Sequence, residues 1–118
     1  MNKLIVALSL GACAFALSGQ ALASGNAANG AELAKKYNCA SCHGADYKTP
    51  IDPSYPKLAG QHADYLVHAL TAYKRGNKAS NGRSNPIMAG MAQPLSDRDM
   101  ADIAAYLQSL PGTLVTKR

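Results

Sequence analysis

The chain has 118 residues, of which 47% are hydrophobic and 16% are charged, and its formal net charge is +5. This length suits one small globular domain, which excludes a multidomain enzyme, a collagenous repeat, a coiled coil and a multi-span membrane protein. The 12 basic residues form no dense run of the kind that binds nucleic acid, and 3 cysteines are too few for a disulfide-rich scaffold.

The first 23 residues have the pattern of a secretory signal. Lys3 supplies the positive start, residues 4–17 are apolar and uncharged, and residues 21–23 give a small-x-small cleavage pattern. The apolar stretch is shorter than the roughly 20 residues of a spanning helix, which argues against a retained membrane anchor. We therefore expect residues 1–23 to be removed on export and residues 24–118 to form the mature domain.

A second interpretation of the N-terminus involves Cys13. The segment Leu10-Gly11-Ala12-Cys13 resembles a bacterial lipoprotein box, in which the cysteine carries lipid after cleavage. Only about nine residues separate Lys3 from this cysteine, which is short for a signal sequence. Lipidation is the lesser alternative.

Three segments have helical periodicity: about residues 27–38, residues 63–75, and a third that begins after Ser96 and ends at Pro111. Ser96 is a good N-cap, and Gly76 stands where a helix C-cap glycine is expected. The segments between them, residues 44–61 and 76–95, are rich in Pro, Gly, Asn and Ser and show no helix or strand pattern. The sequence predicts a mostly α domain. Loops of this length are unusual in a small domain unless they have a function, so we expect these two to wrap around a further component.

The motif Cys39-Ala40-Ser41-Cys42-His43 predicts the chemistry of the domain. Cys-x-x-Cys-His is the attachment motif of c-type haem. Two thiols at this spacing can each form a thioether to one porphyrin, and the imidazole of the following histidine can then bind the iron.

Three other interpretations of the motif remain open. A redox-active disulfide is expected in a βαβ context, which the sequence lacks. A zinc site would recruit His62 and His68, but their distance from Cys42 exceeds the zinc-finger gap of about 12–15 residues. A structural disulfide would leave the long loops unexplained.

Residues 25–110 resemble the class I c-type cytochromes, in particular small soluble bacterial ones with one haem and the halves of duplicated two-haem ones. The matching motifs occur in the family's order: Gly30, Cys39 to Gly44, Tyr55 to Gln61, Met88 to Met91, Leu95-Ser96-Asp97 and Ala104 to Leu107. The resemblance implies an all-α class I cytochrome c fold, in which three main helices and long loops surround one covalently bound haem c with its iron.

The family also implies a methionine sulfur on the far side of the iron, which favours ferrous iron and raises the reduction potential. The family pattern Met-x-Gly places this ligand at Met88, with Met91 as its rival. Met100 belongs to the apolar stripe of the last helix, and we expect it in the core. His62 or His68 as the distal ligand would give a lower-potential bis-histidine site.

Two further contacts are implied by the resemblance. The carbonyl of Pro56 is expected to accept a hydrogen bond from the His43 ring, although a simple turn proline would give the same sequence. Gly30 and Tyr106 are expected to meet where the first and last helices pack.

The resulting prediction is a periplasmic one-electron carrier that works between membrane-bound or periplasmic redox partners of a respiratory or photosynthetic chain. The sequence shows no acid/base pair, nucleophile or phosphate loop, so we expect neither an enzyme nor a small-molecule substrate. A basic patch of Lys74, Arg75, Lys78 and Arg83 either steers docking to an acidic partner or is an ordinary solvated loop. The alternatives are a haem c subunit of a larger oxidoreductase, and a gas sensor if the methionine ligand is labile.

Overall fold

The structure, a computed structural model, describes residues 24–114. The predicted signal, with Lys3 and Cys13, lies outside the described residues, as do residues 115–118. The elements are α1 (Ala27–Lys36), α2 (Ala40–His43), α3 (Ala63–Arg75), the 3-10 helix η1 (Gly76–Lys78), α4 (Pro86–Ala92) and α5 (Asp97–Ser109). Residues 24–114 contain no strand, and the all-α prediction is confirmed.

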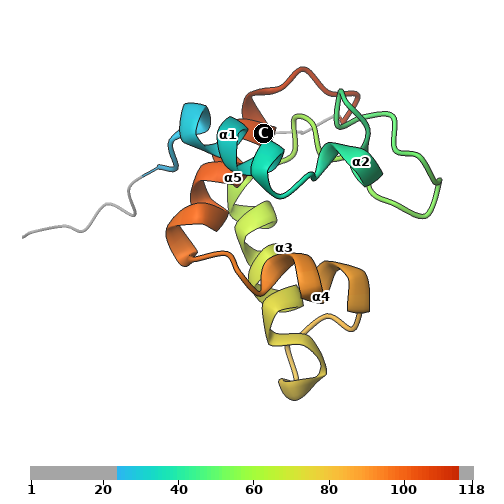
Figure 1. Cartoon of the computed structure of the whole chain (residues 1–118), viewed down its shortest axis with the longest axis vertical. Helices are drawn as coiled ribbons and strands as arrows, with labels where there is room; N and C mark the ends of the chain where they lie inside the picture. The colour runs from blue at the N-terminus through green and yellow to red at the C-terminus, as the bar shows by residue number, and fades with distance from the viewer. Residues whose placement is uncertain (1–23, 115–118) are drawn as a thin grey trace, which may run out of the picture.

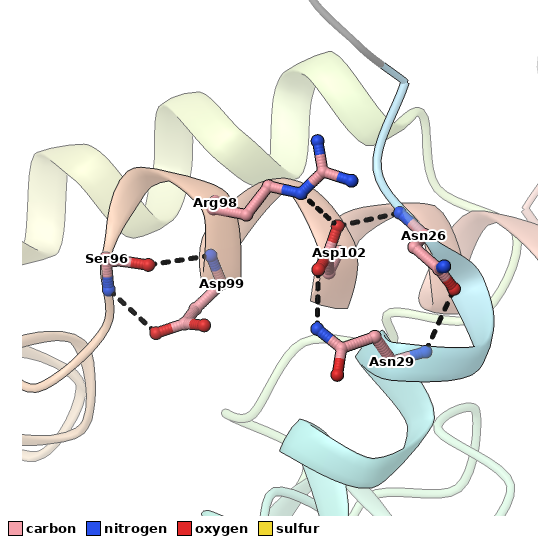
Figure 2. A network of polar contacts seen from close by, with 6 residues as sticks. All are labelled: Asn26, Asn29, Ser96, Arg98, Asp99 and Asp102. Atoms are coloured by element: carbon pink, nitrogen blue, oxygen red, sulfur yellow. Dashed lines mark hydrogen bonds and ion pairs between the residues drawn. The ribbon is translucent and has the colours of Figure 1, made fainter.

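Helix α5 is the centre of the fold, and the predicted start and apolar stripe are both confirmed. Ser96 and Asp99 form a capping box: the Ser96 hydroxyl accepts the Asp99 N–H, and the Asp99 carboxylate accepts the Ser96 N–H, each at 3.0 Å (Figure 2). Met100 and Leu107 face the core and are buried. The helix ends at Ser109 because Leu110, which precedes a proline, is already extended.

Helix α1 packs closely against α5 (Figure 1). A Cβ atom added at Gly30 would lie 1.9 Å from the Asp102 carbonyl oxygen and 2.9 Å from the Tyr106 Cβ. Glycine is therefore required at this crossing, which offsets its poor helix propensity. The predicted contact between Gly30 and Tyr106 is confirmed.

A buried carboxylate joins the start of α1 to α5 (Figure 2). Asp102, only 1% exposed, accepts hydrogen bonds from the Asn26 N–H at 2.7 Å and the Asn29 side-chain amide at 2.6 Å. The Arg98 Nε lies 3.1 Å from the same carboxylate. The Asn26 N–H, followed by the Asn29 amide, lowers the pKa of Asp102, so its charge is retained inside the protein.

Helix α3 packs against both α5 and α4 (Figure 1). Its bounds are those that the sequence predicts, and Gly76 ends it with a φ of 55°. The prediction of an irregular segment over residues 76–95 is wrong, because this segment contains η1 and α4. Asn85 caps α4 by accepting the Met88 N–H at 2.9 Å, and Pro86 occupies its first turn. A helix of 7 residues is too short to show a clear period.

Residues 44–61 form no helix, as predicted, and are hydrogen-bonded to both α2 and α5. The Ile51 N–H bonds the Cys42 carbonyl at 3.1 Å, and the Gly60 N–H bonds the Leu107 carbonyl at 2.9 Å. Near the start of the segment, Tyr47 is buried and packs edge-on against Tyr106 at 5.9 Å between ring centres. These contacts attach the segment to α2 and to α5.

Candidate functional site: a cavity lined by Cys-x-x-Cys-His and two methionines

The end of α1 sets the position of the cysteine motif. Asn38 has a φ of 53°, a left-handed conformation that asparagine tolerates better than most residues. The Cys39 N–H bonds the Ala34 carbonyl and the Asn38 N–H bonds the Lys35 carbonyl, each at 3.0 Å. These two bonds form a Schellman motif, which ends the helix at Lys36 rather than at the predicted residue 38. The backbone of Cys39 is thereby hydrogen-bonded directly to α1.

The single turn of α2 holds the rest of the motif. Cys39 is its N-cap, Cys42 lies in the turn and His43 is its last residue. Both thiols are free and half-buried. Burial is the main cause that raises the pKa of Cys39, so this thiol is protonated near neutral pH.

His43 is oriented by the backbone of the 44–61 segment. Its side chain is 7% exposed, and its Nδ1–H donates to the Pro56 carbonyl oxygen at 2.9 Å. Because a carbonyl only accepts, the proton is on Nδ1 and the lone pair on Nε2 is available to a metal. The predicted contact between His43 and Pro56 is confirmed.

A cavity of about 580 Å³ opens beside the motif and brings the predicted site residues together. Cys39, Cys42, His43, Met88 and Met91 all line it. Leu66 and Leu70 of α3 and Ile103 and Leu107 of α5 form much of its apolar wall. Its volume is in the range of about 300–1,000 Å³ typical of ligand sites. Two thiols, an imidazole with a free nitrogen, a thioether and an apolar wall form a donor set that fits haem c.

The five residues considered as the distal iron ligand lie in different parts of the structure. Met88 and Met91 lie on α4 and both line the cavity, so the prediction that they lie in an irregular segment is wrong. Met100 is 1% exposed in the core, as predicted. His62 precedes α3 as its N-cap rather than belonging to it, His68 is exposed on α3, and neither lines the cavity.

The zinc interpretation receives no support from the described part of the chain. Within residues 24–114, no group of three or more His, Cys, Asp or Glu side chains is placed to hold a metal ion.

No helix in the same range is long and apolar enough to cross a membrane.

The predicted basic patch does not stay together as a set of solvated side chains. The Lys74 Nζ donates to the Leu95 carbonyl, and Arg83 packs over the rings of Tyr65 and Tyr73 at the cavity wall. Arg75 and Lys78 are exposed. Tyr65 and Tyr73 are eight residues apart on α3, which is about two helical turns. Their helical spacing indicated a shared face, but not that an arginine from a later segment covers it.

Comparison with known proteins gives one consistent result. Residues 27–111 match the protein family described as "Cytochrome c". The chain is 41% identical over 118 residues to "Cytochrome c4" of Stutzerimonas stutzeri, in an alignment covering 97% of this chain and 53% of that protein. It is 44% identical over 86 residues to "Cytochrome c-554(548)" of Halomonas halodenitrificans, covering 73% of this chain and 98% of that protein.

The fold agrees with the sequence match. The crystal structure of reduced recombinant cytochrome c4 from Pseudomonas stutzeri aligns with a TM-score of 0.65 and 40% identity, covering 76% of this chain and 48% of that chain. The chain thus spans about half the length of its cytochrome c4 relatives. Cys39 and Cys42 fit the haem c attachment motif of the family. The chain therefore belongs to the cytochrome c family.

Proposed function

We propose that the chain is a periplasmic one-electron carrier in which Cys39 and Cys42 hold one haem c and His43 and Met88 are its axial ligands. The supporting observation is that one cavity is lined by both thiols, His43 and Met88. The haem, when bound, supplies reversible one-electron chemistry. The apolar wall of the cavity would exclude water, the Pro56 carbonyl orients His43, and the Met88 thioether would be the second protein ligand to the iron.

The choice of Met88 rests on the Met-x-Gly pattern, because Met91 lines the same cavity. The test is the visible spectrum of the exported, haem-loaded protein, oxidised and reduced, with and without carbon monoxide. Wild type should be low-spin, six-coordinate and indifferent to carbon monoxide. Met88→Ala should bind carbon monoxide, and Met91→Ala should behave as wild type. The reverse result would make Met91 the ligand, and a carbon monoxide response in wild type would favour a gas sensor.

Export is the second part of the proposal, and it rests on the signal pattern of residues 1–23. Cell fractionation followed by intact mass measurement tests it. The haem-loaded protein should be in the periplasmic fraction and should begin at Ser24. A mass increased by lipid on Cys13 would instead support the membrane-attached alternative.

The partners that we propose are donor and acceptor proteins of a respiratory or photosynthetic chain. Arg75 and Lys78 are the exposed members of the predicted patch and could steer an acidic partner. Electron-transfer rates should then fall as ionic strength rises, and rates indifferent to salt would remove the patch from the proposal. The alternative of a haem c subunit of a larger oxidoreductase also stands, and co-purification in a stable complex would support it.

A further inference from the structure

Arg83 is held more firmly than a surface arginine. Its guanidinium carbon lies 5.6 Å from the ring centre of Tyr65 and 5.4 Å from that of Tyr73. Its Nη2 donates to the Tyr65 hydroxyl at 3.2 Å, and its main-chain N–H donates to the Ala72 carbonyl at 2.9 Å. Both the side chain and the backbone of Arg83 are therefore attached to α3. Stacking on two aromatic faces is a contact that suits the planar guanidinium.

This attachment lies just before the helix that carries the methionines. Asn85 and Pro86 follow Arg83, and Asn85 accepts the Met88 N–H at 2.9 Å as the N-cap of α4. The chain therefore runs from the Arg83 contact into the first turn of α4 within three residues. A shift of residues 83–85 away from α3 would move the turn that holds Met88.

The other end of α4 has separate attachments. The Gln93 side-chain amide donates to the Lys74 carbonyl at 2.8 Å, and the Lys74 Nζ donates to the Leu95 carbonyl. Ala92 is completely buried. The C-terminal end of α4 is thus held on α3 by contacts that do not involve Arg83.

We propose that Arg83, clasped by Tyr65 and Tyr73, is a positioning residue that keeps the Met88 end of α4 closed over the cavity and so sets how fast the methionine leaves the iron. This inference rests on the proposed Met88 ligation. Without the clasp, an external nitrogen ligand such as imidazole would replace the thioether more readily. In that exchange the iron–sulfur bond breaks, an iron–nitrogen bond forms from the imidazole lone pair, and the iron stays ferric.

The test is stopped-flow binding of imidazole to the ferric, haem-loaded protein, because the limiting rate at high imidazole is the rate at which the methionine leaves. Arg83→Gln should raise this rate about tenfold, which corresponds to about 1.4 kcal/mol. Arg83→Lys should give an intermediate rate, because an ammonium keeps the charge but lacks the planar face. Lys35→Gln, which removes an exposed charge on α1, is the control and should leave the rate unchanged.

Two further variants keep the inference separate from the proposed function. Met88→Ala should bind imidazole faster than wild type, and adding Arg83→Gln to it should change nothing more. A wild-type rate in Met88→Ala would overturn the Met88 ligation itself. If Met88→Ala accelerates binding while Arg83→Gln does not, the ligation stands and the clasp is wrong. Should Arg83→Gln fail to fold, Tyr65→Phe, which loses only the hydroxyl acceptor, should show a smaller increase, and no increase would overturn the clasp.

Discussion

The His43 Nδ1–H donates a hydrogen bond of 2.9 Å to the carbonyl oxygen of Pro56, 13 residues further along the chain. The bond fixes which nitrogen carries the proton and makes the imidazole a stronger electron donor to a metal. It also ties the 44–61 segment to the residue that ends α2. The same contact therefore positions the loop and tunes the proposed ligand.

The first prediction follows from this bond. Pro56→Ala keeps the carbonyl but frees the backbone that aims it, so the bond to His43 should weaken and ferric iron should be less stabilised. The reduction potential should rise, by up to about 59 mV if the equilibrium changes tenfold. Spectroelectrochemical titration measures it. Pro53→Ala, an exposed change in the same loop, is the control, and an equal rise there would count against the assignment.

The second prediction concerns removal of the cofactor. Cys39→Ala with Cys42→Ala abolishes covalent attachment and leaves a cavity of about 580 Å³ without its occupant. The sequence has no Trp, and its single Phe, Phe15, belongs to the predicted signal, so we expect no large aromatic hydrocarbon side chain to fill the space. We expect weak helicity and a broad thermal transition in circular dichroism. Native helicity with sharp unfolding would show that the chain folds without haem.

The third prediction tests the crossing of α1 and α5. Gly30→Ala adds a methyl group that meets the Asp102 carbonyl, so the free energy of unfolding should fall by about 1–3 kcal/mol. Gly90→Ala is the control, because a Cβ there meets nothing within 4 Å and alanine favours a helix by up to about 1 kcal/mol. Denaturant unfolding of both haem-loaded variants gives the comparison. Equal losses would mean that the helices do not need this close approach.

The fourth prediction concerns acid. The pKa of Asp102 is lowered from 3.8, so its contribution to stability is present above that pH and is lost as the pH falls through the lower native value. Asp102→Asn should cost about 1–3 kcal/mol at neutral pH, because a buried hydrogen-bond network is broken. The free energy of unfolding of this variant should also decrease less than that of wild type as the pH falls below 3.8. The exposed Asp97→Asn is the control, and an identical acid profile in Asp102→Asn and wild type would refute the prediction.

The fifth prediction concerns alkali. Burial is the main cause that raises the pKa of Tyr47 from 10.0 to about 12. The neutral phenol is therefore favoured in the folded state, and stability should fall as the pH rises from 10 towards 12. Tyr47→Phe should remove this dependence while keeping the ring against Tyr106. The test is to measure the free energy of unfolding of wild type and Tyr47→Phe across this pH range. A decrease of the same size in both proteins would assign the effect to another group.

Local signals were enough to predict α3 and the start of α5. Gly76 and Ser96 have strong conformational or capping preferences, and the apolar stripes beside them are long enough to show a period. Helix α4 lacks this advantage, because its start depends on the Asn85 cap and its 7 residues include Gly90. The end of α1 was misplaced by two residues, since asparagine permits the left-handed turn at Asn38 without requiring it.

Some residues of the site could be predicted from local sequence signals, and others could not. Cys39, Cys42 and His43 are adjacent in sequence, so their shared chemistry is visible without a fold. The place of Met88 beside them came from a family pattern, and the cavity shows both methionines at the same wall. The stacking of Arg83 on Tyr65 and Tyr73 could not be predicted, because it forms only when the segment after α3 folds back along it.

The Schellman motif at the end of α1 has a mechanical consequence. Its bond between the Cys39 N–H and the Ala34 carbonyl makes the attachment point continuous with the helix pair that Gly30 and Asp102 hold together. A group bonded to Cys39 therefore moves with α1 and α5 as one body. Met88 and Met91, which line the same cavity, belong to α4, which is anchored separately on α3. A haem bound to Cys39 and to Met88 would therefore be attached to two separately anchored parts of the fold.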